Sequence, residues 1–414
     1  MPIVYVCRKC RRIYSKAEYA QSRVCIVCGF FLLPTFTKED LAAPVVQGES
    51  LWEKERKERL ALFRAAEGLR QRVGQAKEYE VVSEEESVQG SSVFEGWLWR
   101  SEFEEALRFE RVLLERYRGL SFEEVLPGRV VFNEQGQCYE LSSSCFADFN
   151  VVPFEECRRV LISDLKVLSG IGPVGELLLK RQGYVTVEDL RHHPRWRVQA
   201  CDYMRLVDEG EVGSVQRWLG QRFSMSNPLL HYLAGFCSDQ GFAIVDIETL
   251  GLSERPIILL GIAKPEKGRV CVTQFLLRDI SEEASALWAL VSRLKSGVAL
   301  ITYNGRCFDV PYIGQRLAYY GLEGHSLDNL NFDLLPFTRR ALRSKLANCK
   351  LKTVEKYLGI SRGVDVPGAL VPHFYDTYVR TKNVGPLVPI VEHNRQDLLT
   401  LGVLFSKLYE EWHL

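Results

Sequence analysis

The C-terminal part of the chain alternates between short apolar strands and helical segments, and this alternation constrains the fold more than any other feature. From Gly241 onward, residues 242–249 and 297–303 have the apolar pattern of buried strands. Residues 389–409 carry apolar side chains at the spacing of a long amphipathic helix. Strands that alternate with helices are typical of α/β domains. We therefore expect residues 241–414 to form one α/β domain.

The composition argues against several classes of protein. The 414-residue chain is 46% hydrophobic and 26% charged, which is ordinary for a folded globular protein. Its longest apolar run, at 256–263, has about eight residues, against the ~20 that a membrane-spanning helix needs. The N-terminus lacks an apolar segment long enough for a signal peptide. Twelve cysteines in a chain of this length do not indicate a disulfide scaffold, so we expect a cytoplasmic protein with no membrane partner.

Charge divides the chain before residue 241 into three segments. Residues 1–36 carry six Lys/Arg against one acidic residue, whereas residues 37–157 carry 15 against 25 and residues 158–223 carry 11 against 8. We expect a small domain at 1–36, an acidic, mostly helical connecting region with a β-hairpin at 37–157, and a second helical region at 158–240. Basic segments around an acidic spacer are typical of nucleic-acid binders, although ordinary solvated surfaces produce the same pattern.

Two Cys-x-x-Cys pairs lie in the first 36 residues. Cys7 and Cys10 form the first pair, and Cys25 and Cys28 form the second after 14 intervening residues. Four thiolates suit one tetrahedral Zn²⁺ ion, and a module this small needs a metal for stability. Because four cysteine ligands leave no open coordination position, this zinc would be structural. The segment resembles a zinc ribbon; a redox dithiol or disulfides are the alternatives.

A glycine-rich segment, Gly170-Ile-Gly172-Pro173-Val-Gly175, matches the pattern G-x-G-x-x-G. This pattern predicts a dinucleotide site only after a strand, and residues 160–168 instead have the spacing of an amphipathic helix, which disfavours a dinucleotide-dependent oxidoreductase. Pro173 suits the first turn of a second helix. The segment resembles a helix-hairpin-helix, in which backbone N–H groups around Gly170, Gly172 and Gly175 would bind a phosphate. A purely structural helical hairpin is the alternative.

Carboxylates follow the predicted strands of the α/β domain. Asp246 and Glu248 lie two residues apart on the first strand and so point to the same face. Two adjacent carboxylates repel each other, so they need a cation or one must bind a proton. Asp309 follows the second strand just before a helix, where a helix-capping role is the alternative. His393 and Asp397 lie four residues apart on the predicted C-terminal helix and so share one of its faces. The alternative is an ordinary His–Asp pair on the helix surface.

Together these motifs resemble the DEDD superfamily of nucleases, and within it the YprB-like exonuclease family. The resemblance covers about residues 241–410 and implies a ribonuclease-H-like mixed sheet flanked by helices. The implied active-site acids are Asp246, Glu248, Asp309 and Asp397. The other matching segments are 333–335, 351–355 and 362–375. In these nucleases a Tyr or His near the last Asp orients or deprotonates the attacking water, and His393 stands where the tyrosine subgroup has Tyr.

The resemblance implies hydrolysis of phosphodiester bonds in DNA or RNA, as a 3′→5′ exonuclease. Four carboxylates can hold two Mg²⁺ or Mn²⁺ ions, which would activate water and stabilise the leaving oxygen. Asn304, Arg339 and Arg340 are candidate contacts to the nucleic-acid backbone, although a solvated basic helix would also explain the two arginines. The alternative function is a catalytically silent nucleic-acid-binding protein with a nuclease fold. The sequence indicates no particular protein partner.

Overall fold

The structure is a computed structural model, in which the chain divides into two compact units, Met1–Glu102 and Phe103–Leu414. It describes residues 4–7, 13–14, 32–35 and 92–412, except 148, 238–240, 252–254, 267, 295–296, 323–326, 328 and 364–365. Within these residues, no helix combines the length and apolarity needed to cross a bilayer.

The N-terminal unit contains a small antiparallel sheet. Its strands are β1 (Val4–Cys7), β2 (Ile13–Tyr14) and β3 (Leu32–Thr35), in the order β2-β1-β3. Cys7 ends β1, whereas Cys10, Cys25 and Cys28 lie outside the described residues, so the zinc site stays a prediction. Residues 37–91 of the predicted connecting region also lie outside the described residues.

The second unit is built on a mixed seven-stranded sheet, which confirms the prediction of a mixed sheet. The strands are β4 (Arg129–Asn133), β5 (Gly136–Phe146), β6 (Phe242–Thr249), β7 (Ile257–Glu266), β8 (Arg269–Leu276), β9 (Ala299–Thr302) and β10 (Asn331–Asp333). They follow the order β10-β9-β6-β7-β8-β5-β4. β9 runs parallel to both β6 and β10, and all other neighbours are antiparallel.

The predicted hairpin belongs to this sheet. Strand β5 pairs with β8 from Tyr139↔Leu276 to Phe146↔Arg269, and β4 then forms the outer edge. The predicted connecting region (37–157) and the predicted α/β domain (241–414) therefore contribute strands to the same hydrogen-bonded sheet. The hairpin itself follows from local turn chemistry, but its partner strand lies more than 120 residues away in the sequence.

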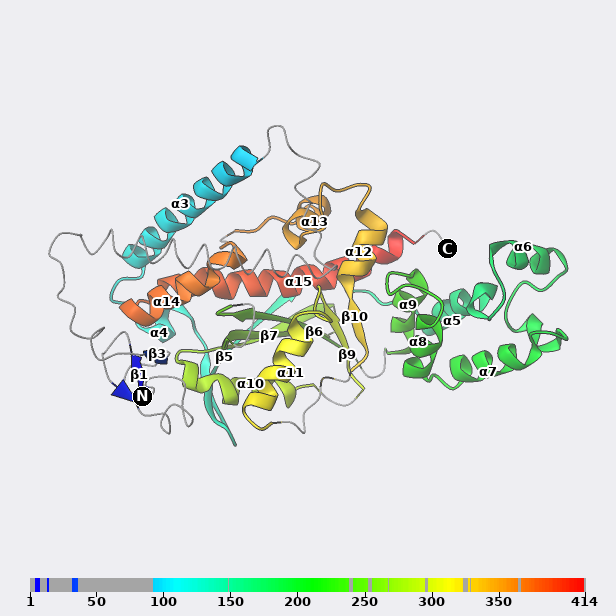
Figure 1. Ribbon diagram of the computed structural model, residues 1–414, viewed down its shortest axis with the longest axis horizontal. Helices are drawn as coiled ribbons and strands as arrows, with labels where there is room; N and C mark the ends of the chain where they lie inside the picture. The colour runs from blue at the N-terminus through cyan, green and yellow to red at the C-terminus, as the bar shows by residue number, and fades with distance from the viewer. Residues whose placement is uncertain are drawn as a thin grey trace. The chain divides into compact units, whose positions relative to one another are not determined.

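Helices cover both faces of the sheet (Figure 1). The long helix α15 (Val388–Glu410) packs on one face, where Leu398 and Phe405 join the core that contains Ile244 of β6. Helices α10 (Glu283–Val291) and α11 (Asp309–Tyr319) pack on the other face, in the core that contains Val245. Since side chains alternate along a strand, Asp246 and Glu248 share the face of Ile244 and point toward α15.

Further helices surround this core. They are α3 (Ser92–Arg116), α4 (Phe122–Val125), α12 (Leu334–Leu342), α13 (Leu351–Leu358) and α14 (Val371–Thr381). The helical region between β5 and β6 contains α5 (Phe154–Ser163), α6 (Pro173–Arg181), α7 (Arg197–Asp208), α8 (Val212–Gly220) and α9 (Pro228–Tyr232).

The helix predicted over residues 160–168 begins and ends earlier in the chain, at Phe154 and Ser163. Helix α5 ends at Ser163, and the side chain of Asp164 accepts a hydrogen bond from the backbone N–H of Lys166, which starts a separate 3₁₀ turn. An Asp that caps a new turn competes with continuation of the helix. Pro173 is the first residue of α6, as predicted, and Gly172 precedes it as the N-cap residue.

Candidate active site

Three of the predicted acids meet at the carboxyl ends of two parallel strands. Asp246 and Glu248 lie near the end of β6, and Asp309 begins α11 after the loop that follows β9. Because β6 and β9 are parallel neighbours, these ends lie at one edge of the sheet. The Asp309 carboxylate accepts a hydrogen bond of 3.3 Å from the backbone N–H of Ile247, which lies between the other two acids.

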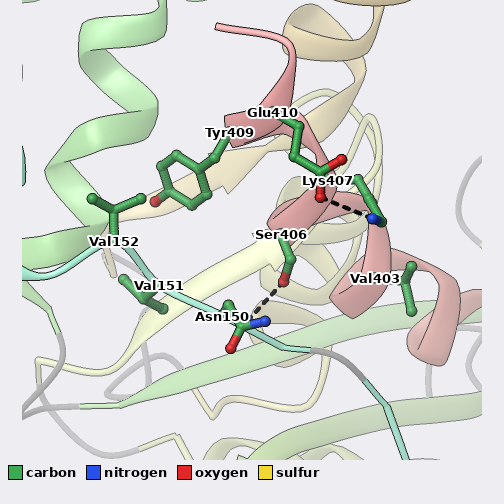
Figure 2. A pocket seen from close by; sticks show the side chains of 8 residues that line it. All are labelled: Asn150, Val151, Val152, Val403, Ser406, Lys407, Tyr409 and Glu410. Carbon is green, nitrogen blue, oxygen red and sulfur yellow. Dashed lines mark hydrogen bonds and ion pairs between the residues drawn. The ribbon is translucent and has the colours of Figure 1, made fainter.

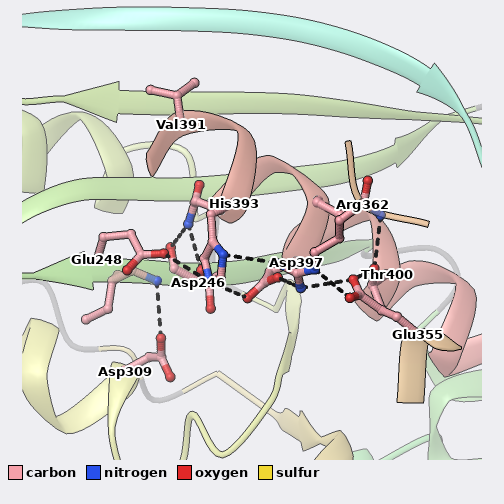
Figure 3. Close-up of polar contacts among 12 residues, drawn as sticks. Asp246, Glu248, Asp309, Glu355, Arg362, Val391, His393, Asp397 and Thr400 are labelled. Carbon is pink, nitrogen blue, oxygen red and sulfur yellow. Dashed lines mark hydrogen bonds and ion pairs between the residues drawn. The ribbon is translucent and has the colours of Figure 1, made fainter. Parts of the chain in front are cut away.

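Helix α15 brings His393 and Asp397 to the same place (Figure 3). Nε2 of His393 lies 3.9 Å from a Glu248 carboxylate oxygen and 3.6 Å from one of Asp397. The pair is therefore directed into the site, unlike an ordinary surface pair. The structure thus brings together the five residues predicted from the sequence to be catalytic, which are Asp246, Glu248, Asp309, His393 and Asp397.

The charges in this site oppose one another. Removal from water raises the pKa of Asp246 well above its usual range, and the charges of Asp397, Asp309 and Glu248 raise it further. Burial raises the pKa of Asp309 to about 7. Burial also raises the pKa of Asp397, although His393 and Arg362 oppose that shift. The cluster thus carries more negative charge than its surroundings neutralise.

A buried amide that the sequence did not nominate holds Asp246 in place. The side-chain N–H₂ of Asn394 donates hydrogen bonds to the carboxylate of Asp246 (2.7 Å) and to its backbone oxygen (3.1 Å). The Asn394 oxygen in turn accepts a hydrogen bond of 2.8 Å from Gln274 of β8. A Cβ atom on Gly261, which pairs with Asp246 across β6 and β7, would collide with Asn394. The sequence feature that could have identified Asn394 is its position, because it is a polar residue on the otherwise apolar face of α15.

A second group, which we call the arginine cluster, consists of Arg362, Glu355, Thr400, His393 and Asp397. Arg362 donates two hydrogen bonds to the buried Glu355 carboxylate, at 2.5 and 3.0 Å. Thr400 of α15 donates a third to Glu355, at 2.6 Å. The same guanidinium forms an ion pair with Asp397 and contacts Nδ1 of His393 at 3.0 Å. Glu355 and Arg362 lie in segments that match the family pattern, but neither was predicted to be a site residue.

The candidate nucleic-acid contacts lie on the neighbouring loop and helix. Asp333, the N-cap residue of α12, accepts hydrogen bonds from the backbone N–H groups of Asn304 (2.7 Å) and Arg306 (3.2 Å). Asn304 has a positive φ of 64°, a conformation that Asn tolerates better than most residues. Asp333 therefore anchors the loop that leads to Asp309, and Arg339 and Arg340 are exposed on the last turn of α12.

The three motif glycines lie in the helical region. Gly170 and Gly172 are exposed, and Gly170 has a φ of 80° that favours glycine, whereas Gly175 is half-buried within α6. Two side chains hold this turn through hydrogen bonds to Ser169, one from α7 and one from Trp196, the residue before α7. Gln199 accepts a hydrogen bond from the N–H of Ser169, and the Trp196 indole donates one to the Ser169 carbonyl oxygen.

The acid cluster fits hard divalent cations by its chemistry. Asp246, Glu248, Asp309 and Asp397 offer only carboxylate oxygens, which Mg²⁺ and Mn²⁺ prefer, and their mutual repulsion favours a bound cation. Within the described residues, no three His, Cys, Asp or Glu side chains are already arranged as a metal cage. The four carboxylates would have to adjust their positions to bind a metal ion.

A separate hollow lies beside the C-terminal half of α15 (Figure 2). It has a volume of about 230 Å³. Its lining residues are Asn150, Val151, Val152, Val403, Ser406, Lys407, Tyr409 and Glu410. The backbone N–H of Asn150 donates to Ser406, and Lys407 pairs with Glu410. The hollow includes none of the acids described above, so it is distinct from the candidate active site.

Comparison with known proteins places this site in a defined class of domain. Residues 243–409 match the family described as the RNase_H superfamily. This span contains all four acids and, apart from the first residue of β6 and the last of α15, the elements from β6 to α15. The seven-stranded mixed sheet flanked by helices agrees with that match. The chain therefore contains a ribonuclease-H-like domain.

Two particular proteins are similar to parts of the chain. The "Uncharacterized protein YprB" of Bacillus subtilis (strain 168) is 34% identical over 180 residues, which cover 41% of this chain and 43% of that protein. The match thus spans less than half of this relative's length. The structure of the family B DNA polymerase of Pyrobaculum calidifontis covers 41% of this chain and 24% of that one, with a TM-score of 0.33 and 16% identity. A structural similarity this low carries no conclusion about function.

Proposed function

We propose that the protein is a metal-dependent nuclease that hydrolyses phosphodiester bonds of DNA or RNA, as a 3′→5′ exonuclease. The observation that carries this proposal is the meeting of four carboxylates, from two strand ends and α15, at one edge of a ribonuclease-H-like sheet. Asp246, Glu248, Asp309 and Asp397 would hold two Mg²⁺ or Mn²⁺ ions. Bound there, the ions would supply an activated water and stabilise charge on the leaving oxygen.

The protein's own residues would perform the remaining tasks. Asn394 holds the Asp246 carboxylate in one orientation, and His393 faces the acids from α15. Exposed Arg339 and Arg340 would contact the nucleic-acid backbone electrostatically. The exposed turn around Gly170 and Gly172 offers backbone N–H groups to phosphate, which would hold nucleic acid without reading its sequence.

The assay uses the full chain with end-labelled single-stranded and duplex DNA and RNA, with Mg²⁺, Mn²⁺ or chelator. We expect metal-dependent release of mononucleotides from 3′ ends, and protection when the 3′ end is blocked. Cleavage of a circular substrate, which has no ends, would show that the protein is an endonuclease instead of an exonuclease. Absence of cleavage of every substrate would remove the proposed activity.

One observation favours the alternative of a silent nucleic-acid-binding protein. Arg362 forms an ion pair with Asp397 and so neutralises one of the four acids without a metal. If that arrangement persists in the working protein, the same assay will show nucleic-acid binding without metal-dependent cleavage.

We also propose that Cys7, Cys10, Cys25 and Cys28 hold one structural Zn²⁺ ion. The proposal rests on the spacing of the two Cys-x-x-Cys pairs. Metal analysis of the purified chain should find about one zinc per chain. Replacing Cys7 and Cys10 by Ser should release it, while the unit of residues 103–414 stays folded. A disulfide among the four cysteines in the native protein would contradict zinc binding.

A further inference from the structure

The arginine cluster determines which nitrogen of His393 carries a proton. Nδ1 of His393 lies 3.0 Å from a terminal nitrogen of the Arg362 guanidinium. A guanidinium has five N–H donors and no acceptor, and it stays charged in proteins. Nδ1 must therefore be the acceptor in this hydrogen bond. In a neutral imidazole, the hydrogen must then sit on Nε2.

The guanidinium is itself held firmly, so this contact does not depend on a mobile side chain. Only 9% of the Arg362 side chain is exposed, and only 2% of Glu355. Two hydrogen bonds to Glu355 fix the plane of the guanidinium, and Thr400 fixes Glu355 against α15. Arg362 cannot easily turn a different group toward His393.

The protonated nitrogen faces the acids. Nε2 lies 3.6 Å from a carboxylate oxygen of Asp397 and 3.9 Å from one of Glu248, so the nitrogen that carries the hydrogen is the one directed into the site. These distances are longer than a direct hydrogen bond, so the interaction is electrostatic or requires a small closure. The contact of Nδ1 with Arg362 alone determines the tautomer.

We propose that Arg362 is a positioning residue that holds His393 with Nε2 protonated, so that His393 presents an N–H donor to the active site instead of a general base. Its site-facing nitrogen has no lone pair with which to take a proton from water. The donor instead faces the carboxylates of β6 and α15 and the substrate groups that bind between them. This role for His393 rests on the proposed nuclease function, but the tautomer does not.

The tautomer can be measured without catalysis. The full chain labelled with ¹⁵N-histidine, at pH about 8 and without added Mg²⁺ or Mn²⁺, gives long-range ¹H–¹⁵N spectra that distinguish a protonated ring nitrogen from a bare one. The chain has seven histidines, and the signal that disappears in His393→Gln belongs to His393. We expect a bare Nδ1 and a protonated Nε2. A hydrogen on Nδ1, in the neutral ring or in an imidazolium, would overturn the proposal.

A variant of Arg362 tests the cause of this preference. Arg362→Met removes the donor and should convert the His393 signals to those of a mixture of tautomers. Arg205→Met is the matched control, because Arg205 is an exposed arginine in the helical region that pairs with Glu209, and it should leave the signals unchanged. A His393 signal that keeps one tautomer in folded Arg362→Met would contradict the role of Arg362. If this variant does not fold, the wild-type spectrum still decides the tautomer.

Catalysis separates a donor from a base. A glutamine amide can donate an N–H near the position of Nε2 but cannot act as a base, and phenylalanine can do neither. For a donor, His393→Phe should lose about 10²–10³-fold in kcat, whereas His393→Gln should stay within about tenfold of wild type. For a general base, both variants should lose about 10²–10⁴-fold, and that equal loss would overturn the donor role. A wild-type chain that cleaves nothing would defeat the proposed function and leave the tautomer measurement valid.

Discussion

Acids of the helical region and acids at the edge of the sheet experience opposite environments. Burial raises the pKa of Glu176 in α6, but hydrogen bonds from Lys166 and Lys180 outweigh it and leave that pKa lowered. The backbone N–H of Thr186 lowers the pKa of Asp189. At the sheet edge, burial and neighbouring carboxylates raise the pKa of Asp246 and Asp309 instead.

This difference separates structural acids from acids arranged for a ligand. A carboxylate whose pKa is lowered has found partners inside the fold, so its charge contributes to stability at neutral pH. Carboxylates whose pKa values are raised have partners that do not offset burial and mutual repulsion, so their charge lowers the stability of the fold at neutral pH. Burial of the apolar core on the α15 face of the sheet contributes free energy that offsets this repulsion.

The largest expected effect is on cleavage. Asp246→Asn and Asp397→Asn should each abolish metal-dependent cleavage without loss of folding, because each removes a proposed metal ligand and relieves repulsion. Asp189→Asn in the helical region should cleave at the wild-type rate. Cleavage is measured with end-labelled substrate, and folding by circular dichroism. Normal turnover in either sheet-edge variant would remove its acid from the proposed site.

The next effect concerns pH and metal. The pKa of Asp309 is about 7 in the fold, above the ~3.9 of an unfolded chain, so the folded state binds this proton more tightly. Its contribution to stability is present below about pH 4 and is lost as pH rises toward 7. We expect Asp309→Asn to raise the free energy of unfolding of the metal-free chain at pH 7, and Asp189→Asn to lower it.

A cation should reverse this loss. At a concentration about 100 times its Kd, Mg²⁺ or Mn²⁺ should add about 2.7 kcal/mol to the wild-type free energy of unfolding. Urea titrations at several pH values, with metal or with chelator, measure both effects. An equal gain in Asp246→Asn would show that the metal binds elsewhere.

A third effect concerns the spacing between α15 and the sheet. Gly261→Ala should lower the free energy of unfolding by about 1–3 kcal/mol, because its Cβ would displace Asn394 and Leu398. Gly213→Ala in α8 is the control, since no atom within 4 Å would meet its Cβ, and it should raise stability by up to about 1 kcal/mol. Urea denaturation of both variants checks this contrast. A neutral Gly261→Ala would mean that α15 shifts without cost.

The smallest expected effect is on nucleic-acid binding by the helical region. Gly172 is the N-cap residue of α6 and has extended backbone angles that other residues adopt, so both Ser and Asp can cap the helix there. Asp also brings a negative charge to the proposed phosphate site and should weaken binding by about 0.3–1 kcal/mol for all nucleic-acid sequences alike. Gly172→Ser, the uncharged control, should bind like wild type in fluorescence anisotropy. Equal affinity of the Asp and Ser variants would leave the glycine turn purely structural.

Much of the sheet edge could be predicted from local patterns. Alternation along 242–249 placed Asp246 and Glu248 on one face, and the helical spacing of His393 and Asp397 placed both on one face of α15. The glycine and proline positions likewise predicted the start of α6, because capping depends on neighbouring residues. These features depend on separations of two to four residues, where backbone geometry leaves few choices.

The sequence by itself therefore determined the alternating strands and helices and the acids that they carry. Only the tertiary structure decided what surrounds those acids. It placed Asn394 against Asp246 and Arg362 against His393, and it joined β5 to β8. Each of these contacts joins residues 31 to 148 positions apart in the chain. Such pairings follow from how whole helices and strands pack, and no local periodicity encodes them.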